Sequence, residues 1–489
     1  MSDLSFVRSE MLPERAPPPS TVGVVGWMRE NLFNGITNSV LTVLSVVFIV
    51  WCVVGFLGWA ISPTWAAANL RDCQELVTGH EGACWGVVRD RWQQLLFGFY
   101  PQALYWRPIL AFVLLFIALI PVLFAMISRR MNWFLLLAVL AFGASQIGGV
   151  VGMILAIVLA AGAAFVGFKL VTTNKADRAE EIAAGAKRLP NPLIFSVLYP
   201  FIAPWLLWGG SLWMPIVALL GFVLGWAAMR LTADVIGTLG ATILAFVVPV
   251  LWWLFAAAGF ADIAQGVLPI GIEAVQSRDF GGMLLSLTIG VVAISISLPI
   301  GIVLALGRQS DLMIVKALCV GFIEFIRGVP LITLLFVAST LLNIFMPKGT
   351  NFDIILRVII MATLFSSAYM AETIRGGLAA LPRGQYEAAD ALGLDYWKAQ
   401  RLIIMPQALK ISIPGIVSNF IGLFKDTTLV SIIGLLDPLG LSNTIRAHTD
   451  WVGIYWELFA VIALMFFVFC FSMSRYSMYL ERRLRTDHR

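Results

Sequence analysis

The chain has 489 residues, of which 60% are hydrophobic and only 12% are charged, and its formal net charge is +5. Soluble globular domains carry about 25% charged residues, so a chain this poor in charge cannot cover a surface that faces water. The composition therefore excludes a soluble globular protein and predicts an integral membrane protein with many spans, in which Lys and Arg mark cytoplasmic loops and do not indicate a nucleic-acid partner.

Residues 1–38 are predicted to form a cytoplasmic N-terminal tail. The stretch from Met1 to Glu30 is polar and contains the run Pro17-Pro18-Pro19. The first apolar core of the chain begins only at about Val40. A cleavable signal peptide needs such a core close to its start, so we do not expect one here.

Apolar segments long enough to cross a bilayer recur along the rest of the chain. A transmembrane helix needs about 20 mainly apolar residues. We expect about twelve such helices, at residues 39–61, 108–127, 131–147, 149–169, 192–208, 212–229, 236–258, 285–307, 315–345, 354–373, 411–435 and 454–474. The predicted fold class is therefore an all-α polytopic membrane protein.

Basic residues suggest a topology for these helices, because Lys and Arg accumulate in cytoplasmic loops. With the N-terminus inside, the expected inner loops contain most of them, including the group between Lys175 and Arg188. The basic C-terminal tail, residues 479–489, then also lies inside. Both termini are thus expected in the cytoplasm, and so is the polar stretch 382–406.

One long outer loop, residues 62–107, contains Cys73 and Cys84. In an oxidising compartment the two cysteines favour a disulfide, and two buried free thiols are the alternative. The other three cysteines lie within apolar segments and are interpreted as packing residues.

Motifs for catalysis and for nucleotide or metal binding are absent from the sequence. There is no Gly-x-x-x-x-Gly-Lys-Ser/Thr, so we expect no ATP at a P-loop on this chain. The three histidines are scattered without metal-ligand spacing, and neither His-Glu-x-x-His nor Gly-x-Ser-x-Gly occurs. The sequence therefore predicts no catalytic residue, no metal site and no cofactor.

Charged residues inside apolar segments are the better indication of function, because they are costly in lipid. Glu324 and Arg327 are spaced i, i+3 and can pair on one helix face. Glu372 and Arg375 repeat this spacing. Pairing that fixes the helix bundle and a role in a translocation pathway are both open for these residues.

A second polar group lies within the segment 411–435. Lys425, Asp426 and Thr428 interrupt an apolar run. Asn419 precedes Asp426 by seven residues, which places both on one helix face. Adjacent opposite charges cannot both face lipid, so these residues favour a polar translocation pathway.

The stretch 387–410 is amphipathic, unlike the segments on either side. A short helix is predicted first, ended by Gly393, and Asp395 is a good N-cap for a second helix that runs to Met405. Pro406 then begins the next element. A helix that lies on the lipid surface and a helix that docks on a protein fit this pattern equally well.

The order of residues in this stretch resembles the EAA loop of bacterial ABC importer permeases. The matching positions are Glu387, Ala388, Ala389, Gly393, Ile403 and Pro406, with Met405 where the family usually has Leu. The segments IEFIRGVPL, SSAYMAETIRGGLAALPRGQYEAADALG, IMPQALKISIPG and FKDTTLVSIIG look like the polar amino acid branch of this family. With its long N-terminal half, the sequence is similar to the larger permease subunit of the general L-amino acid ABC transporters of Gram-negative bacteria.

The resemblance implies a type I importer permease core of five helices at residues 281–478, after an N-terminal extension of about seven helices at 39–280. It further implies that the EAA positions couple this chain to an ATPase dimer, which binds ATP and Mg²⁺. A homologous second permease subunit, a periplasmic amino-acid-binding protein, membrane lipid and an L-amino acid substrate are the other expected partners. The expected location is a bacterial inner membrane.

Other classes of function are open on the residues alone. An ion-coupled secondary transporter would use Glu324, Glu372 or Asp426 as its proton or sodium site. An intramembrane enzyme would need a nucleophile with a base, or a set of metal ligands, and neither is found. A separate role of the N-terminal half, in binding lipid or the binding protein, is compatible with the importer hypothesis.

Overall fold

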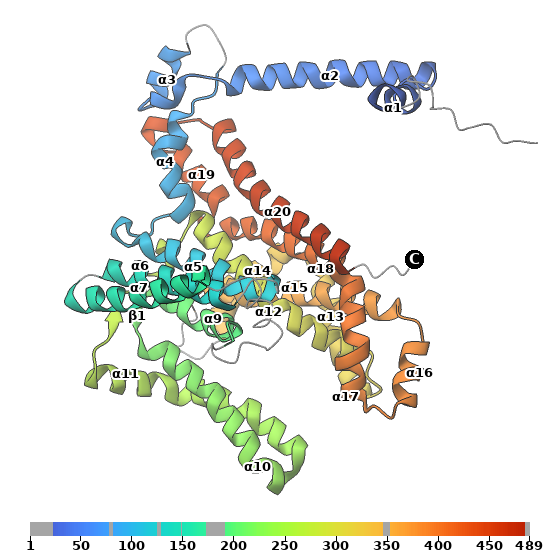
Figure 1. Cartoon of the computed structure of the whole chain (residues 1–489). Coiled ribbons are helices and arrows are strands. Elements are labelled where there is room, and N and C mark those ends of the chain that lie inside the picture. Colours follow the sequence, from blue (N-terminus) through green and yellow to red (C-terminus); the bar gives the residue numbers. More distant parts are fainter. Residues whose placement is uncertain are drawn as a thin grey trace, which may run out of the picture. The chain divides into compact units, whose positions relative to one another are not determined.

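The computed structural model describes residues 23–77, 82–124, 129–147, 149–172, 191–345 and 353–484. The beginning of the expected N-terminal tail, the basic group between Lys175 and Arg188 and the end of the C-terminal tail lie outside these described residues. Within them the chain is almost entirely helical (Figure 1), which confirms the all-α class.

Helices follow one another along the whole chain. In the first half they are α1 (Gly23–Asn31), α2 (Ile36–Ala60), α3 (Leu70–Leu76), α4 (Gly86–Phe97), α5 (Trp106–Leu123), α6 (Arg129–Ile147), α7 (Gly149–Thr172), α9 (Leu193–Trp208), α10 (Trp213–Leu251) and α11 (Ala257–Val267). In the second half they are α12 (Gly282–Arg308), α13 (Met313–Gly328), α14 (Leu331–Phe345), α15 (Ile354–Ala379), α16 (Gly384–Ala391), α17 (Tyr396–Ala399), α18 (Met405–Asp426), α19 (Pro438–Arg446) and α20 (Trp456–Leu484).

Short elements connect these helices. The 3₁₀ or π-helical segments are η1 (Thr64–Ala66), η2 (Gln102–Leu104), η3 (Trp252–Ala256), η4 (Ser277–Asp279), η5 (Gln400–Ile404), η6 (Thr427–Ile433) and η7 (Thr449–Trp451). The two-residue strands β1 (Gly210–Ser211) and β2 (Gly271–Ile272) pair antiparallel, with Gly210 opposite Ile272.

In the described part of the chain, nine helical segments are long and apolar enough to cross a membrane, or ten if the bent pair α13 and α14 is one span. The expected number of about twelve also counts α6 and α9. α9 has only 16 residues, fewer than a straight span needs. The division expected near residues 230–235 instead falls at Gly237, which has a φ of 76° and kinks α10.

The chain divides into two compact units. Unit 1 consists of the residues up to Asp90 together with 448–458, and unit 2 contains the rest. Helix α2 in unit 1 has no residue buried against the described chain, so its apolar surface is available to lipid or to another protein.

Unit 1 joins the first loop after α2 to a loop from the second half of the chain. A disulfide links Cys73 and Cys84, and the Cys84 backbone N–H donates to the Glu457 carboxylate (2.8 Å). The indole of Trp451 is fully buried and donates to Asp90 Oδ2 (2.9 Å). The two loops therefore fold as one structure.

In unit 2, small residues allow α12 and α15 to pack closely. Ala293, Ser297, Gly301 and Ala305 recur every four residues on one face of α12, and all are buried. A side chain at Gly301 would overlap Met370 of α15. Such small-residue stripes let transmembrane helices approach at backbone distance, because lipid supplies no hydrophobic drive for their association.

Where α12 begins, backbone packs directly on backbone. We call the contact among Leu95, Gly98, Phe280, Gly281, Gly282 and Leu436 the glycine seam. Gly98 bridges to Phe280, and Gly281 bridges to Leu436. A Cβ at Gly98 would overlap the backbone of Gly281, and one at Gly282 would overlap the Leu95 carbonyl. The seam thus joins residues from both halves of the chain.

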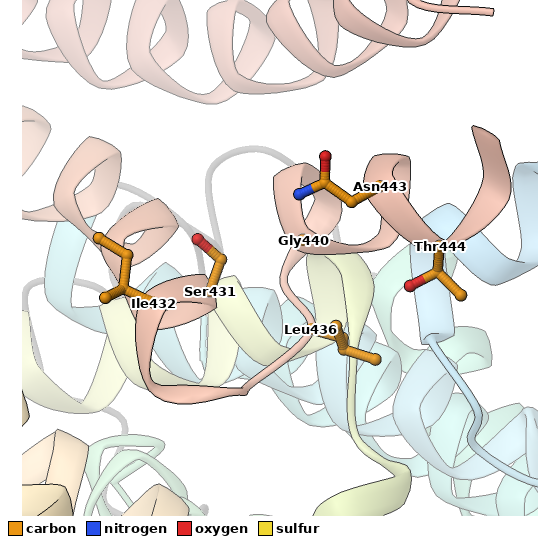
Figure 2. Close-up of a pocket in the computed structure, with 6 residues that line it drawn as sticks. All are labelled: Ser431, Ile432, Leu436, Gly440, Asn443 and Thr444. Atoms are coloured by element: carbon orange, nitrogen blue, oxygen red, sulfur yellow. The ribbon is translucent and has the colours of Figure 1, made fainter. Parts of the chain in front are cut away.

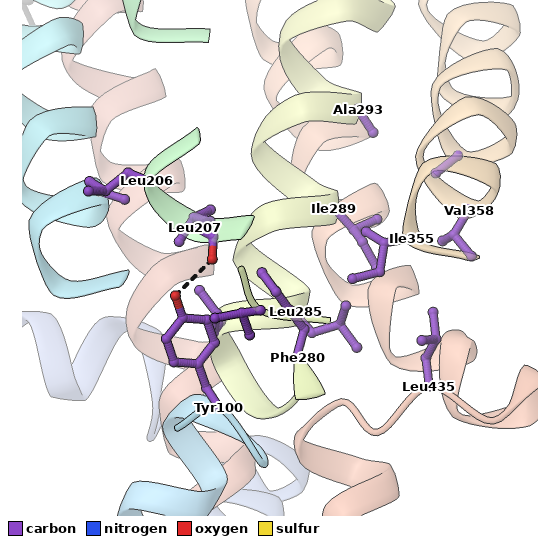
Figure 3. Packing of buried hydrophobic residues seen from close by; sticks show 14 of the residues in the cluster. Tyr100, Leu206, Leu207, Phe280, Leu285, Ile289, Ala293, Ile355, Val358 and Leu435 are labelled. Atoms are coloured by element: carbon purple, nitrogen blue, oxygen red, sulfur yellow. Dashed lines mark hydrogen bonds between the residues drawn. The ribbon is translucent and has the colours of Figure 1, made fainter. Parts of the chain in front are cut away.

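A hydrophobic cluster behind the seam combines residues of α5, α9, α12 and α15 (Figure 3). Tyr100 and Phe280 pack edge to face within it, with their ring centroids 5.5 Å apart. The Tyr100 hydroxyl donates to the Leu207 carbonyl (2.7 Å). Burial raises the pKa of Tyr100 to about 12, so the hydroxyl keeps its proton and this hydrogen bond at all physiological pH values.

The prediction that the second helix of the stretch 387–410 ends at Met405 is wrong. α17 passes through the π-helical segment η5 directly into α18 without a break. A π-helical turn changes the hydrogen-bond register, and Pro406 then falls in the first turn of α18, where a missing N–H costs least. Pro406 therefore lies inside one continuous helical segment.

Candidate functional site

The predicted helix pair is present as α16 and α17, which lie side by side (Figure 1). Gly393 between them has a left-handed φ of 66°, and a Cβ there would meet no atom within 4 Å. Glycine is therefore required for the backbone conformation and not for space. Asp395 caps α17 as expected, because its Oδ1 accepts from the Lys398 N–H (3.0 Å).

The base of the helix pair is packed on unit 2. Ile404 is buried in a cluster with residues of α12, α13 and α15, and Tyr386 packs against this cluster. Gln407 Nε2 donates to Gln385 Oε1 (2.9 Å), which ties α18 to α16. Burial, and then the neighbouring Tyr396, raise the pKa of Tyr386. The pair is thus a fixed extension of the bundle.

The tip of the pair is apolar and exposed. Leu392 is 73% exposed and Trp397 is 70% exposed. Of the six EAA positions, Ala389 is buried and Ile403 is half-buried, whereas the other four, Glu387, Ala388, Gly393 and Pro406, are exposed. Exposed apolar side chains next to exposed charge on a rigid support are typical of a surface that binds another protein.

Five charged side chains from three helices meet at the other functional region. We call Arg308, Glu324, Arg327, Glu372 and Arg375 the charged cluster. Arg308 Nη1 lies 2.9 Å from Glu324 Oε1 and 3.3 Å from Glu372 Oε2. Arg375 Nη2 lies 2.5 Å from Glu372 Oε1. The structure therefore brings the two expected i, i+3 pairs together into one network.

Arg308 is the member of the charged cluster that sequence reasoning missed. It is the last residue of α12 and lies just beyond the span expected at residues 285–307. Its glutamate partners lie 16 and 64 residues further along the chain, so no local spacing connects them. The sequence did contain one indication of this contact. Arg308 ends a long apolar helix, and two other apolar segments carry the carboxylates Glu324 and Glu372.

Asn419 of α18 lies beside the same part of α15. Its Nδ2 donates to Thr373 Oγ1 (2.8 Å). The guanidinium of Arg327 lies 5.7 Å from the ring centroid of Tyr369, one turn before Thr373. Glu324, Arg327, Glu372 and Asn419 are thus gathered around one stretch of α15.

Lys425, Asp426 and Thr428 occupy a different place. They lie at the far end of α18, where the α-helix tightens into η6. Thr428 Oγ1 donates to the Lys425 carbonyl (2.9 Å). Because Asp426 lies seven residues beyond Asn419, it is displaced along the helix by about 10 Å. The two expected polar groups therefore form separate regions.

A pocket of about 440 Å³ lies between η6 and α19 (Figure 2). Its lining consists of Ser431, Ile432, Leu436, Gly440, Asn443 and Thr444. The buried Asp437 supports it by accepting from the backbone N–H of Gly440 (2.9 Å) and that of Leu439 (3.1 Å). Burial raises the pKa of Asp437 to about 6, against the opposing effect of these hydrogen bonds. The Asp437-Pro438 sequence is a helix-start signal that would have predicted α19.

Among the described residues, no three His, Cys, Asp or Glu side chains come together as metal ligands. The charged cluster consists of arginines and glutamates, which form ion pairs. This arrangement can hold helices together and bind ions or zwitterions, and it offers no nucleophile with a base.

Comparison with known proteins gives a consistent picture. Residues 297–486 match the family described as "Binding-protein-dependent transport system inner membrane component". The glutamate/glutamine/aspartate/asparagine transport system permease protein BztC of Rhodobacter capsulatus is 51% identical over 100% of both chains. The inner membrane amino-acid ABC transporter permease protein YhdY of Escherichia coli is 34% identical over 97% of this chain and 96% of its own.

A shorter relative matches only part of the chain. The probable glutamine ABC transporter permease protein GlnP of Bacillus subtilis is 32% identical over 203 residues. These residues are 91% of that protein but only 41% of this chain. The similarity to shorter permeases thus accounts for less than half of the sequence.

Proposed function

Because the chain belongs to the family of binding-protein-dependent transport system inner membrane components, we propose that it is a permease subunit of an ATP-driven importer of L-amino acids. Relatives that match nearly all of its length are permeases whose names specify amino-acid transport. The observation that carries the proposal is the helix pair at residues 384–404, whose base is buried and whose apolar tip is exposed.

The protein that binds this tip is the ATPase subunit of the importer. Exposed Leu392, Trp397 and Leu402 present an apolar surface, and Glu387 of α16 is an exposed charge on the same helix pair. ATP and Mg²⁺ are bound by that partner, and closure of the ATPase dimer moves the tip.

The continuous helical segment carries this movement into the membrane. From Tyr396 to Asp426 the chain is helical without a break. At a rise of about 1.5 Å per residue this segment reaches on the order of 45 Å. It connects the exposed tip to Asn419 and so to the polar face of α15. A lever of this kind transmits displacement only if it is stiff, and the passage through η5 keeps it unbroken.

The translocation pathway runs along the charged cluster and Asn419. The side chain of Glu324 is 53% exposed and that of Arg327 is 34% exposed on the isolated chain. Charges in a spanning segment do not face lipid, so this surface is covered by water or by protein. The second permease subunit supplies the opposite wall. Lys425, Asp426 and Thr428 line the end of the pathway nearer the outside.

The transport cycle is a shift between two conformations. ATP binding favours the outward-open state, in which a periplasmic binding protein releases its amino acid into the pathway, and hydrolysis restores the inward-open state. The amino acid affects this equilibrium only through its different affinities for the two states. No bond within the amino acid is made or broken.

We expect the chain to lie in a bacterial inner membrane with both termini in the cytoplasm, and the distribution of its basic residues supports this orientation. The charged cluster and the helix pair then lie toward the inside. The disulfide between Cys73 and Cys84 lies outside, where an oxidising compartment maintains it.

Purification of the tagged chain from its native membrane tests the proposal. An ABC ATPase and a second permease are expected to co-purify and to be identified by mass spectrometry. Glu387→Lys should lose the ATPase, whereas Glu481→Lys, an equal charge change at an exposed position near the end of α20, should retain it. Uptake that proceeds without ATP and collapses with an ion gradient would instead support a secondary transporter.

A further inference from the structure

One spanning segment of unit 2 is broken beside the charged cluster. α13 ends at Gly328, and α14 begins at Leu331 after a bend of 100°. Pro330 lies in the break and cannot donate a backbone hydrogen bond. Discontinuous helices in transporters place backbone ends and polar side chains at the substrate, because irregular backbone at membrane depth is tolerated only where it lines a cavity or is buried in protein.

Arg327 is the last side chain before this break, and its contacts differ from those of the other two arginines. Its Nη1 lies 4.0 Å from both Glu324 Oε2 and Glu372 Oε2. Arg308 instead donates hydrogen bonds to both glutamates (2.9 and 3.3 Å), and Arg375 donates two to Glu372. The carboxylates are therefore engaged mainly by these two, and Arg327 is held only loosely.

The charges of the cluster do not balance. Three arginines meet two glutamates, which leaves one positive charge in excess. An excess cation in a spanning segment is costly unless an anion or water reaches it. A guanidinium binds a carboxylate with two parallel hydrogen bonds, which is the strongest pairing available to it. A carboxylate group of a bound molecule therefore matches the loosely held guanidinium of Arg327.

We propose that Arg327 binds the α-carboxylate of the amino acid as it passes through the pathway. The proposal rests on the function proposed above and names the group that recognises the substrate. The Arg327 guanidinium lies over the ring of Tyr369 of α15. Thr373, one turn further along α15, accepts a hydrogen bond from Asn419 of α18. Every L-amino acid carries an α-carboxylate, so Arg327 recognises a group that all substrates share. It does not distinguish one substrate's side chain from another's.

Equilibrium binding to the purified complex tests this role. The complex that co-purifies with the tagged chain is placed in lipid nanodiscs without the binding protein, which would itself recognise the carboxylate. Tritiated L-glutamine is the probe, and γ-aminobutyramide, which is glutamine without its α-carboxylate, is the competitor. The measured quantity is the ratio of the two affinities.

The wild-type complex should bind glutamine more tightly than γ-aminobutyramide by about tenfold or more, as expected for a charge-assisted contact. Arg327→Gln should reduce this ratio to about one, and Arg327→Lys should keep part of it because the charge remains. Arg375→Gln is the matched control, since it removes an equal charge from the same cluster. It should retain the ratio even where total binding falls.

Three results would overturn the assignment: an unchanged ratio in Arg327→Gln, an equal loss in Arg375→Gln, or a wild-type complex that binds both compounds equally or binds neither. Size-exclusion profiles and thermal unfolding of each variant establish that the complex is intact. ATP dependence of uptake by the wild-type complex is measured in parallel. ATP-independent uptake contradicts the importer itself, whereas ATP-driven uptake with an unchanged ratio contradicts only the role of Arg327.

Discussion

The glycine seam and the charged cluster hold unit 2 together by opposite kinds of contact. In the seam, backbone meets backbone, and no side chain fits between Gly98 and Gly281. In the cluster, partly exposed side chains from three helices meet at unequal distances, from 2.5 to 4.0 Å. Close-packed backbone has one geometry, whereas ion pairs of this kind can exchange partners. The comparison indicates a fixed frame at one end of α12 and a region that rearranges at the other.

A single methyl group should break the fixed frame, and this is the largest effect we expect. Gly98→Ala places a Cβ against the Gly281 backbone at a φ of 68°. We expect a loss of about 3 kcal/mol or more in unfolding free energy, from backbone strain and overpacking together. Denaturant unfolding in detergent measures it. Gly210→Ala is the control, because it has a φ of 86° but no atom within 4 Å, and should lose only about 1 kcal/mol. Equal losses would contradict the seam.

The moving region should be uncoupled by a change at the helix pair that leaves the frame intact. Gly393→Asp puts a side chain on a left-handed backbone at the exposed tip. We expect ATP-driven uptake to fall on the order of tenfold, which corresponds to a modest coupling free energy between sites. Uptake into proteoliposomes and ATP hydrolysis by the same complex measure the coupling. Gly384→Asp, at a position without a left-handed φ, is the control, and unchanged uptake in Gly393→Asp would count against the lever.

Within the charged cluster, Arg308 and Glu372 should be energetically coupled. The 3.3 Å contact predicts that Arg308→Gln and Glu372→Gln together cost less than the sum of the two single changes. We expect a coupling of about 1 kcal/mol, because the side chains are partly exposed. A double-mutant cycle on unfolding in detergent measures it. Strict additivity would show that the ion pair contributes nothing to the bundle.

The smallest effect concerns the pH dependence of the buried carboxyl beside the pocket. The pKa of Asp437 is raised from 3.8 to about 6 by burial, so the folded protein holds this proton more tightly than the unfolded chain. Its contribution to stability is therefore present below pH 4, falls as pH rises to about 6, and is constant above that. Melting temperatures of the wild type and Asp437→Asn across this range should diverge by a few degrees. Parallel curves would refute the assignment.

The parts of the structure that the sequence predicted well depend on local patterns. Apolar length located most of the spanning helices, although α6 and α9 are not among the segments long and apolar enough to cross a membrane. Gly393 with Asp395 located the turn of the helix pair. The errors have physical reasons. Pro406 was taken as a boundary because a proline interrupts an α-helix, but a π-helical turn precedes it. Arg308 has no partner nearby in the sequence, and the approach of Gly98 to Gly281 joins residues far apart in the chain. Contacts between residues so far apart in the sequence leave no periodic pattern in it.

The hydrogen bond between Cys84 and Glu457 has a consequence for how the protein is made. The two residues are 373 positions apart in the chain. At about 5–20 residues per second, the ribosome needs roughly 20–75 s to synthesise the partner of the earlier loop. During that interval the first loop already contains Cys73 and Cys84, which can be oxidised, but it lacks its contact with Trp451. A chain that is truncated before Glu457 lacks this hydrogen-bond partner, so completion of unit 1 requires that translation has passed residue 458.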